Sequence, residues 1–158
     1  MNASHHGEQR RRILAIASGG GHWVQLLRLR PAFEGCRVTY VTVREDYRAD
    51  LAPGARFRVI NDATRWDKVG LVKMALRLAW ILLRERPHVI ISTGAAPGYF
   101  AIRLGRLLGA RTLWLDSIAN VEEVSMTGQI VGRYADLWLT QWPHLAGPQG
   151  PRCEGAVL

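Results

Sequence analysis

ILAIASGGGHWVQLLRL, residues 13–29, is the stretch that decides the fold. It begins with a continuous apolar run, Ile13–Ala17, passes through three glycines and continues from Trp23 with helical spacing until Pro31. An apolar run that ends in glycines and opens a helix is typical of a buried strand, a tight loop and a helix. The stretch therefore predicts one strand–loop–helix unit of an α/β protein.

The same unit recurs along the chain. Further strands are predicted at 37–43, 57–60, 88–92, 111–116 and 137–140, and helices at 69–86, 99–108 and around 128–133. Strands that alternate with helices, each strand an unbroken apolar run, favour a parallel sheet covered on both faces. We therefore predict an α/β fold, a Rossmann-like doubly wound parallel sheet.

Length and composition indicate a single domain. The chain has 158 residues, of which 48% are hydrophobic, enough to bury a core without staples. We expect a disordered basic N-terminus over 1–12, one domain over 13–143 and a tail over 144–158, where Pro and Gly recur without a strand or helix pattern. Cys36 and Cys153 lie far apart without partner ligands, so neither a disulfide framework nor a zinc site is expected, and the predicted compartment is the reducing cytoplasm.

The net charge of +8, from 21 Lys and Arg against 13 Asp and Glu, favours polyanionic partners such as nucleic acid, anionic lipid or phosphorylated substrates. We expect neither a secretion signal nor a spanning helix, because Lys73 and Arg77 interrupt the longest apolar candidate. Any membrane association is predicted to be peripheral. The aromatic residues are not interleaved with Lys and Arg along strands in the way that stacks bases, so we expect no nucleic acid partner.

The loop Ser18-Gly19-Gly20-Gly21-His22 is the strongest candidate for a ligand site. Its glycines permit close approach of a ligand to the backbone, and the helix that follows presents free N–H groups and the positive end of its dipole. An anion such as a phosphate fits that site; the alternative is that the glycines only make a tight turn. The loop lacks the third glycine of a dinucleotide fingerprint and the Gly-Lys-Ser/Thr ending of a P-loop, so no nucleotide cofactor is expected.

Two side chains are candidates for catalysis. His22 ends the glycine loop, where an imidazole can take a proton or hold a phosphate oxygen, although a histidine at a helix start is often only a surface residue. Asp116 follows a strand and can act as a base or bind a substrate hydroxyl; its alternative role is to cap the next helix. Polar and small residues beside them complete the predicted acceptor or phosphate site: Thr93 and Gly94 in a second small-residue loop, and Ser117 and Asn120 after Asp116.

The long helix predicted at 69–86 carries a basic aromatic face. Lys73, Arg77, Trp80 and Arg84 fall within about 60° of one another at 100° per residue. Tryptophan among cations suits a membrane interface, where the ring lies at headgroup level. The alternative is a solvated basic face with Trp80 packed against a neighbouring element.

Taken together, these motifs resemble the acceptor-binding, membrane-anchoring subunits of two-component UDP-sugar glycosyltransferases, which serve asparagine-linked glycosylation and, in bacterial relatives, exopolysaccharide and capsule assembly. The similarity extends from Ile13 to Pro143, nearly the whole chain. The resembling stretches are Ser18–His22, Ser92–Gly94, Asp116–Ala119, Ser125–Gly128, Ala135–Leu137 and Gln141–Pro143.

This resemblance implies that the chain is the N-terminal, acceptor-binding half of a GT-B glycosyltransferase on the cytoplasmic face of the cell membrane. A separate donor-binding subunit would hold the UDP-sugar, and the acceptor would be a saccharide on a lipid diphosphate. The implied chemistry is metal-independent and inverting. The position of His22 matches a histidine in the glycine-rich loop of the one-chain relatives, where it is implicated in acceptor activation. The eukaryotic subunits carry an N-terminal transmembrane helix that this sequence lacks, so attachment would rest on the basic helix or on the partner. A non-catalytic membrane scaffold that activates a complete transferase is the alternative function.

Overall fold

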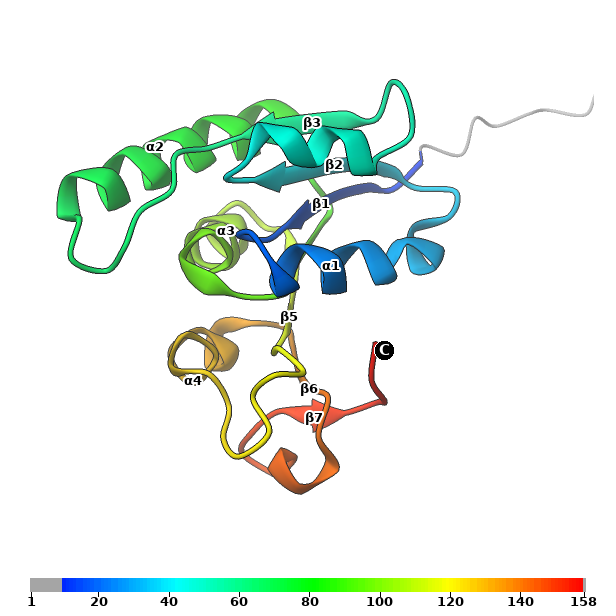
Figure 1. Ribbon diagram of the computed structural model, residues 1–158, viewed down its shortest axis with the longest axis vertical. Helices are drawn as coiled ribbons and strands as arrows, with labels where there is room; N and C mark the ends of the chain where they lie inside the picture. Colours follow the sequence, from blue (N-terminus) through cyan, green and yellow to red (C-terminus); the bar gives the residue numbers. More distant parts are fainter. Residues whose placement is uncertain (1–9, 158) are drawn as a thin grey trace, which may run out of the picture.

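Seven parallel strands form one sheet in the computed structural model, which describes residues 10–157 (Figure 1). The strand order is β3-β2-β1-β4-β5-β6-β7, and every neighbouring pair is parallel. The strands are β1 (Arg12–Ile16), β2 (Arg37–Thr42), β3 (Arg56–Val59), β4 (Val89–Ser92), β5 (Arg111–Leu115), β6 (Leu137–Thr140) and β7 (Arg152–Cys153). The predicted Rossmann-like α/β fold is thereby confirmed.

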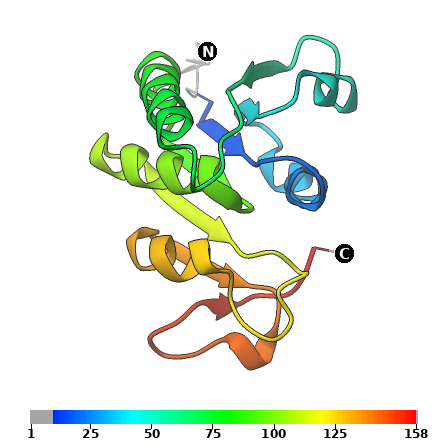
Figure 2. The ribbon, with the colours of Figure 1, turned by 60° about the vertical axis from the view of Figure 1, so that its left-hand side comes forward.

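Helices cover both faces of this sheet (Figure 2). The α-helices are α1 (Gly21–Arg28), α2 (Lys68–Glu85), α3 (Ala95–Leu107) and α4 (Met126–Val131). Short 3-10 turns are η1 (Arg30–Phe33), η2 (Glu45–Asp50), η3 (Gly132–Tyr134) and η4 (Pro143–Leu145). Helices α2, α3 and α4 pack on one face and α1 with η1 on the other.

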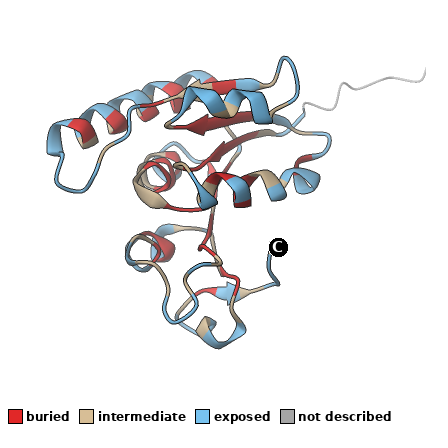
Figure 3. Ribbon diagram, in the orientation of Figure 1, coloured by how far each residue is buried: buried red, intermediate tan, exposed pale blue. Residues whose placement is uncertain are grey.

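The central strands form the core because their side chains alternate between the two layers. In β1, Leu14 and Ile16 point toward α2 and α3, whereas Ile13 and Ala15 point toward α1. All four are at most 7% exposed. Figure 3 shows the inner strands largely in the colour of buried residues. Since both faces are buried, the strands need no polar alternation, which explains the continuous apolar runs in the sequence.

The order of the strands reverses between β1 and β4. The chain passes from β1 outward to β2 and β3, and α2 then returns it to β4 on the other side of β1. In such sheets the loops at the carboxyl ends of these two strands diverge and leave a crevice between them. The glycine loop after β1 and the small-residue loop after β4 both lie at this position.

Three boundaries differ from the expectation. The region 144–158, expected to be a tail without a strand, contains β7, which pairs with β6. Helix α3 begins at Ala95, not at Tyr99, because Pro97 lies in the first turn, where its missing N–H costs nothing. Strand β1 includes Arg12, while the rest of the expected disordered N-terminus, apart from Arg10 and Arg11, lies outside the described residues.

Candidate functional site at the carboxyl ends of β1, β4 and β5

The glycine loop connects β1 to α1 in a shape that requires glycine. Gly20 has a φ of 63°, in the left-handed region, and its N–H donates to the Tyr47 hydroxyl at 2.8 Å. Gly20 is also the N-cap of α1 and brings no side chain over the helix start. The N–H groups of the first helical turn therefore keep the open, positive end that binds anions.

His22 lies in the first turn of α1 and bridges the crevice to the loop after β4. Its Nδ1 is 2.8 Å from the Thr93 carbonyl oxygen, and the Thr93 hydroxyl donates to the His22 carbonyl oxygen at 2.6 Å. A carbonyl oxygen can only accept, so Nδ1 must carry a proton. In the neutral ring this leaves the lone pair on Nε2, the state that a general base requires.

The loop after β4 is shaped around the His22 ring. Gly94 has a φ of 140°, and a Cβ at this position would lie 2.6 Å from both Cε1 and Nδ1 of His22. Ala95, the first residue of α3, has a φ of 66°, unusual for a residue with a Cβ. The start of α3 thus reaches the same crevice as the start of α1, so two helix N-termini flank the histidine.

Asp116 has a different environment from the one expected for a base. It is 2% exposed and its Oδ2 accepts from the Ser125 N–H at 2.7 Å. Its Oδ1 accepts from the Ser125 hydroxyl at 2.6 Å and from the Asn120 side chain at 3.3 Å. Ser125 in turn caps α4, since its Oγ accepts from the Gly128 N–H. These contacts favour the structural alternative, in which Asp116 supports the start of the next helix.

Ser117 and Asn120 belong to the same loop and make internal contacts. The Ser117 hydroxyl oxygen accepts from the Gln25 side chain at 3.1 Å and from the Ala119 N–H at 3.2 Å. Asn120 donates to Asp116 as described. The structure therefore brings His22, Thr93 and Gly94 together around one ring, and places Asp116, Ser117 and Asn120 in the adjacent loop after β5.

A buried amide pair that the sequence did not reveal holds this loop. Gln25 and Gln141 are each 4% exposed. The Gln25 carbonyl oxygen accepts from the Ile118 N–H at 3.1 Å, and the Gln141 amide donates to the Asp116 carbonyl oxygen at 3.0 Å. Gln141 begins the Gln-Trp-Pro motif, so only that half of the pair carried a signal. The pair fixes the backbone of 116–118 one helical turn from His22.

The predicted basic aromatic face of α2 is exposed. The guanidinium carbons of Arg77 and Arg84 lie 5.0 and 5.7 Å from the Trp80 ring centroid, within cation–π range. Trp80 is 48% exposed, and Lys73 is exposed as well. Four apolar side chains of the same helix are 59% to 67% exposed: Val69, Val72, Leu76 and Leu83. Together with Lys73, Arg77, Trp80 and Arg84 they form an exposed surface that we call the α2 stripe.

The opposite face of α2 is already packed on the sheet, so these exposed apolar side chains are not needed for the core. Exposed apolar patches of this kind mark interaction surfaces. Met74, Leu78 and Ile81 form that packed face.

Within residues 10–157, no helix combines the length and apolarity needed to cross a bilayer. Over the same range, no three His, Cys, Asp or Glu side chains gather closely enough to hold a metal ion.

Comparison with known families gives a match over most of the chain. A family model described as oligosaccharide biosynthesis protein Alg14 like matches residues 37–153. The UDP-N-acetylglucosamine transferase subunit ALG14 of Eremothecium gossypii is 26% identical over 167 residues, which covers 86% of this chain and 75% of the relative. The subunit of the same name from Yarrowia lipolytica is 34% identical over 77 residues, 45% of this chain and 35% of the relative.

Solved structures of similar fold are longer than this chain. MurG from Acinetobacter baumannii superimposes with a TM-score of 0.72 at 15% identity, covering 89% of this chain and 44% of MurG. A putative UDP-N-acetylglucosamine 2-epimerase from Listeria monocytogenes superimposes with a TM-score of 0.64 at 13% identity, covering 84% of this chain and 39% of the epimerase. The chain thus spans less than half of either structure. At these identities the likeness shows the fold.

Proposed function

The chain belongs to the Alg14-like family of oligosaccharide biosynthesis proteins, and from this premise we propose that it is the acceptor-binding, membrane-docking subunit of a two-chain glycosyltransferase. Family and fold support a role as a glycosyltransferase subunit. The partner subunit holds the UDP-sugar, and this chain binds a saccharide on a lipid diphosphate. The observation that carries the proposal is the His22 ring held between two open helix N-termini.

The diphosphate of the acceptor lies across the N-termini of α1 and α3 in this proposal. Each terminus offers backbone N–H groups and the positive end of a helix dipole, and neither requires a metal ion. The acceptor hydroxyl then lies near Nε2 of His22. Because the Thr93 carbonyl holds the proton on Nδ1, Nε2 can take the hydroxyl proton as the acceptor oxygen attacks the anomeric carbon and UDP leaves, with inversion.

The α2 stripe supplies the membrane contact. Since α2 connects β3 to β4, it starts at the same edge of the sheet as the His22 crevice. The apolar side chains of the stripe enter the headgroup region, while Lys73, Arg77 and Arg84 contact anionic lipid. A subunit docked in this way on the cytoplasmic face presents its crevice to a lipid-linked acceptor.

Sugar transfer from UDP-N-acetylglucosamine to a lipid-diphosphate acceptor, measured with and without the partner subunit, tests the proposal. We expect turnover only with both chains, and a decrease of about 10²- to 10⁴-fold for His22→Ala, as is usual for loss of a general base. His88→Ala, at the opposite edge of the sheet, is the matched control and should leave turnover unchanged. Full turnover by this chain alone, or by the complex with His22→Ala, would contradict the proposal; the second result would favour a non-catalytic scaffold.

Sedimentation with vesicles tests the docking surface separately. Leu76→Gln with Trp80→Gln should weaken binding to vesicles that contain phosphatidylglycerol. Leu107→Gln removes a side chain that is 82% exposed on α3 and serves as the control. Equal binding of all three proteins would exclude the α2 stripe as the membrane contact.

A further inference from the structure

The amino-terminal edge of the sheet, opposite the His22 crevice, is rich in arginine. Strands β1, β2, β3 and β5 each begin with an arginine, and α2 ends at this edge with Arg84 and Glu85. The proposed acceptor site uses none of these side chains. Their role is therefore a separate question from that of the crevice.

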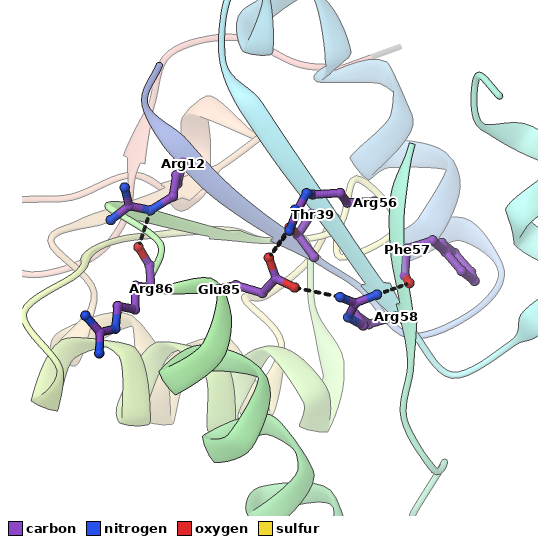
Figure 4. Close-up of polar contacts among 7 residues, drawn as sticks. All are labelled: Arg12, Thr39, Arg56, Phe57, Arg58, Glu85 and Arg86. Atoms are coloured by element: carbon purple, nitrogen blue, oxygen red, sulfur yellow. Dashed lines mark hydrogen bonds and ion pairs between the residues drawn. The ribbon is translucent and has the colours of Figure 1, made fainter. Parts of the chain in front are cut away.

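Glu85 anchors the cluster at the end of α2 (Figure 4). Its side chain is 6% exposed and binds two guanidinium groups, that of Arg56 at 2.7 Å and that of Arg58 at 2.9 Å. The Thr39 hydroxyl donates to the same carboxylate at 3.3 Å. Burial alone would raise the pKa of Glu85, but the charges of Arg56 and Arg58 with these hydrogen bonds outweigh burial and lower it. Glu85 is therefore a carboxylate at neutral pH, and its charge is shared by two cations.

Two further arginines leave this cluster with excess positive charge. Arg37, Arg56, Arg58, Arg84 and Glu85 line a cavity of about 300 Å³, so four guanidinium groups face one carboxylate. Within residues 10–157, the Arg37 and Arg84 side chains form no ion pair. The buried Nε of Arg58 also lacks a hydrogen-bond partner in that part of the chain. Like charges held around one cavity repel one another, and an anion in the cavity would relieve that repulsion.

We propose that this cavity, the arginine pocket, binds a phosphate group at a site separate from the acceptor crevice. Guanidinium groups match the geometry of phosphate oxygens through paired N–H donors, and several can share one phosphate. All five lining side chains are charged, which suits a compact anion and offers a nucleobase or sugar ring little apolar surface. The phosphate group belongs either to a small soluble molecule or to a lipid headgroup, since the pocket lies at the end of the exposed α2 stripe.

Calorimetric titration of the full chain with inorganic phosphate and pyrophosphate tests the pocket directly. Arg37→Gln is the informative variant, because Arg37 is exposed, lies outside α2 and leaves the Glu85 pairs intact. We expect phosphate to bind the variant about tenfold more weakly, the usual worth of one charge-assisted hydrogen bond. Arg133→Gln removes the same charge from an exposed position on η3 and is the matched control. Arg37→Lys keeps the charge without the paired donors and should bind with intermediate affinity.

Vesicle binding distinguishes the two sources of the phosphate group. If the source is soluble, Arg37→Gln weakens phosphate or pyrophosphate binding and leaves vesicle binding as in Arg133→Gln. If the source is a headgroup, Arg37→Gln weakens binding to phosphatidylglycerol vesicles but not to phosphatidylcholine vesicles. Any phosphate that binds at the glycine loop is unaffected by Arg37, so its contribution is the same in Arg37→Gln and in Arg133→Gln. If Arg37→Gln and Arg133→Gln behave alike in every titration, the pocket does not bind phosphate. Since sugar transfer is not measured and Arg37 lies on β2, outside the membrane-docking face of α2, this outcome is independent of the proposed function.

Discussion

Replacement of Asp116 by alanine separates a structural role from a catalytic one. The exchange removes two short hydrogen bonds from Ser125, at 2.7 and 2.6 Å, and a longer one from Asn120. Hydrogen bonds to a charged group contribute about 1.5–3 kcal/mol each, so loss of the two short bonds costs at least about 3 kcal/mol. For a domain of this size that lowers Tm by roughly 6–12 °C. With a urea m-value of about 2 kcal/mol/M, the midpoint falls by about 1.5 M.

Urea unfolding followed by tryptophan fluorescence and by circular dichroism measures this loss. Asn120→Ala removes only the 3.3 Å contact and should cost less than about 1 kcal/mol. Asp116→Asn keeps one oxygen acceptor and should fall between the two. The reasoning is refuted if Asp116→Ala unfolds within about 0.5 kcal/mol of the unaltered chain, the range of an ordinary surface substitution, and yet abolishes sugar transfer. Asp116 would then act on the substrate and not on the loop.

Two further predictions follow from the crevice and from the opposite edge. Gly94→Ala places a Cβ against the His22 ring and should lower the rate of sugar transfer by at least tenfold in a folded protein. Gly109→Ala is the control, because Gly109 also has a positive φ but a Cβ there would meet no atom within 4 Å, and its rate should be unchanged. Equal rates for the two variants would argue against a fixed His22 ring. The pKa of Glu85 is lowered from its ordinary value of 4.5, so its contribution to stability is complete above about pH 5 and is lost as the pH falls through the lowered pKa. Glu85→Gln should therefore flatten the decrease in unfolding free energy below about pH 5, and an unchanged slope would show that other carboxylates dominate.

The sequence predicted most of the fold because buried parallel strands carry a strong local signal. Six strands were predicted close to their observed positions, because most of them are runs of apolar or β-branched residues that can be recognised by themselves. Strand β7 carries no such signal: Arg152–Cys153 is two residues long and exists because the edge of β6 offers it hydrogen bonds. The start of α3 was missed for a related reason, since Pro97 is typical of loops and its tolerance in a first turn depends on where the helix begins.

The site was predictable at the level of loops and not at the level of contacts. Three adjacent glycines before a helix identify the loop that ends in His22 by themselves, whatever the rest of the chain does. The bond from His22 to the Thr93 carbonyl joins residues 71 positions apart, so it depends on the reversal of strand order between β1 and β4. Gln25 lies on an otherwise ordinary amphipathic helix, and a single buried glutamine there follows no pattern that a sequence reveals. Asp116 had the right place for a base, and only its contacts show that its oxygens are used by the loop.

The length of the strands separates the two anion sites that we propose. Strand β1 has five residues and β2 has six, so at a rise of about 3.3 Å per residue the sheet spans roughly 16–20 Å from the arginine pocket to the crevice edge. One diphosphate is far too short to contact both ends, so the pocket cannot be an extension of the acceptor site. Additivity follows from this separation: substitutions at His22 and Arg37 lie too far apart to share a ligand or a packing neighbour, and their effects should add. A strong coupling between them in phosphate binding would mean that a larger ligand, or a conformational change along α2, joins the two edges of the sheet.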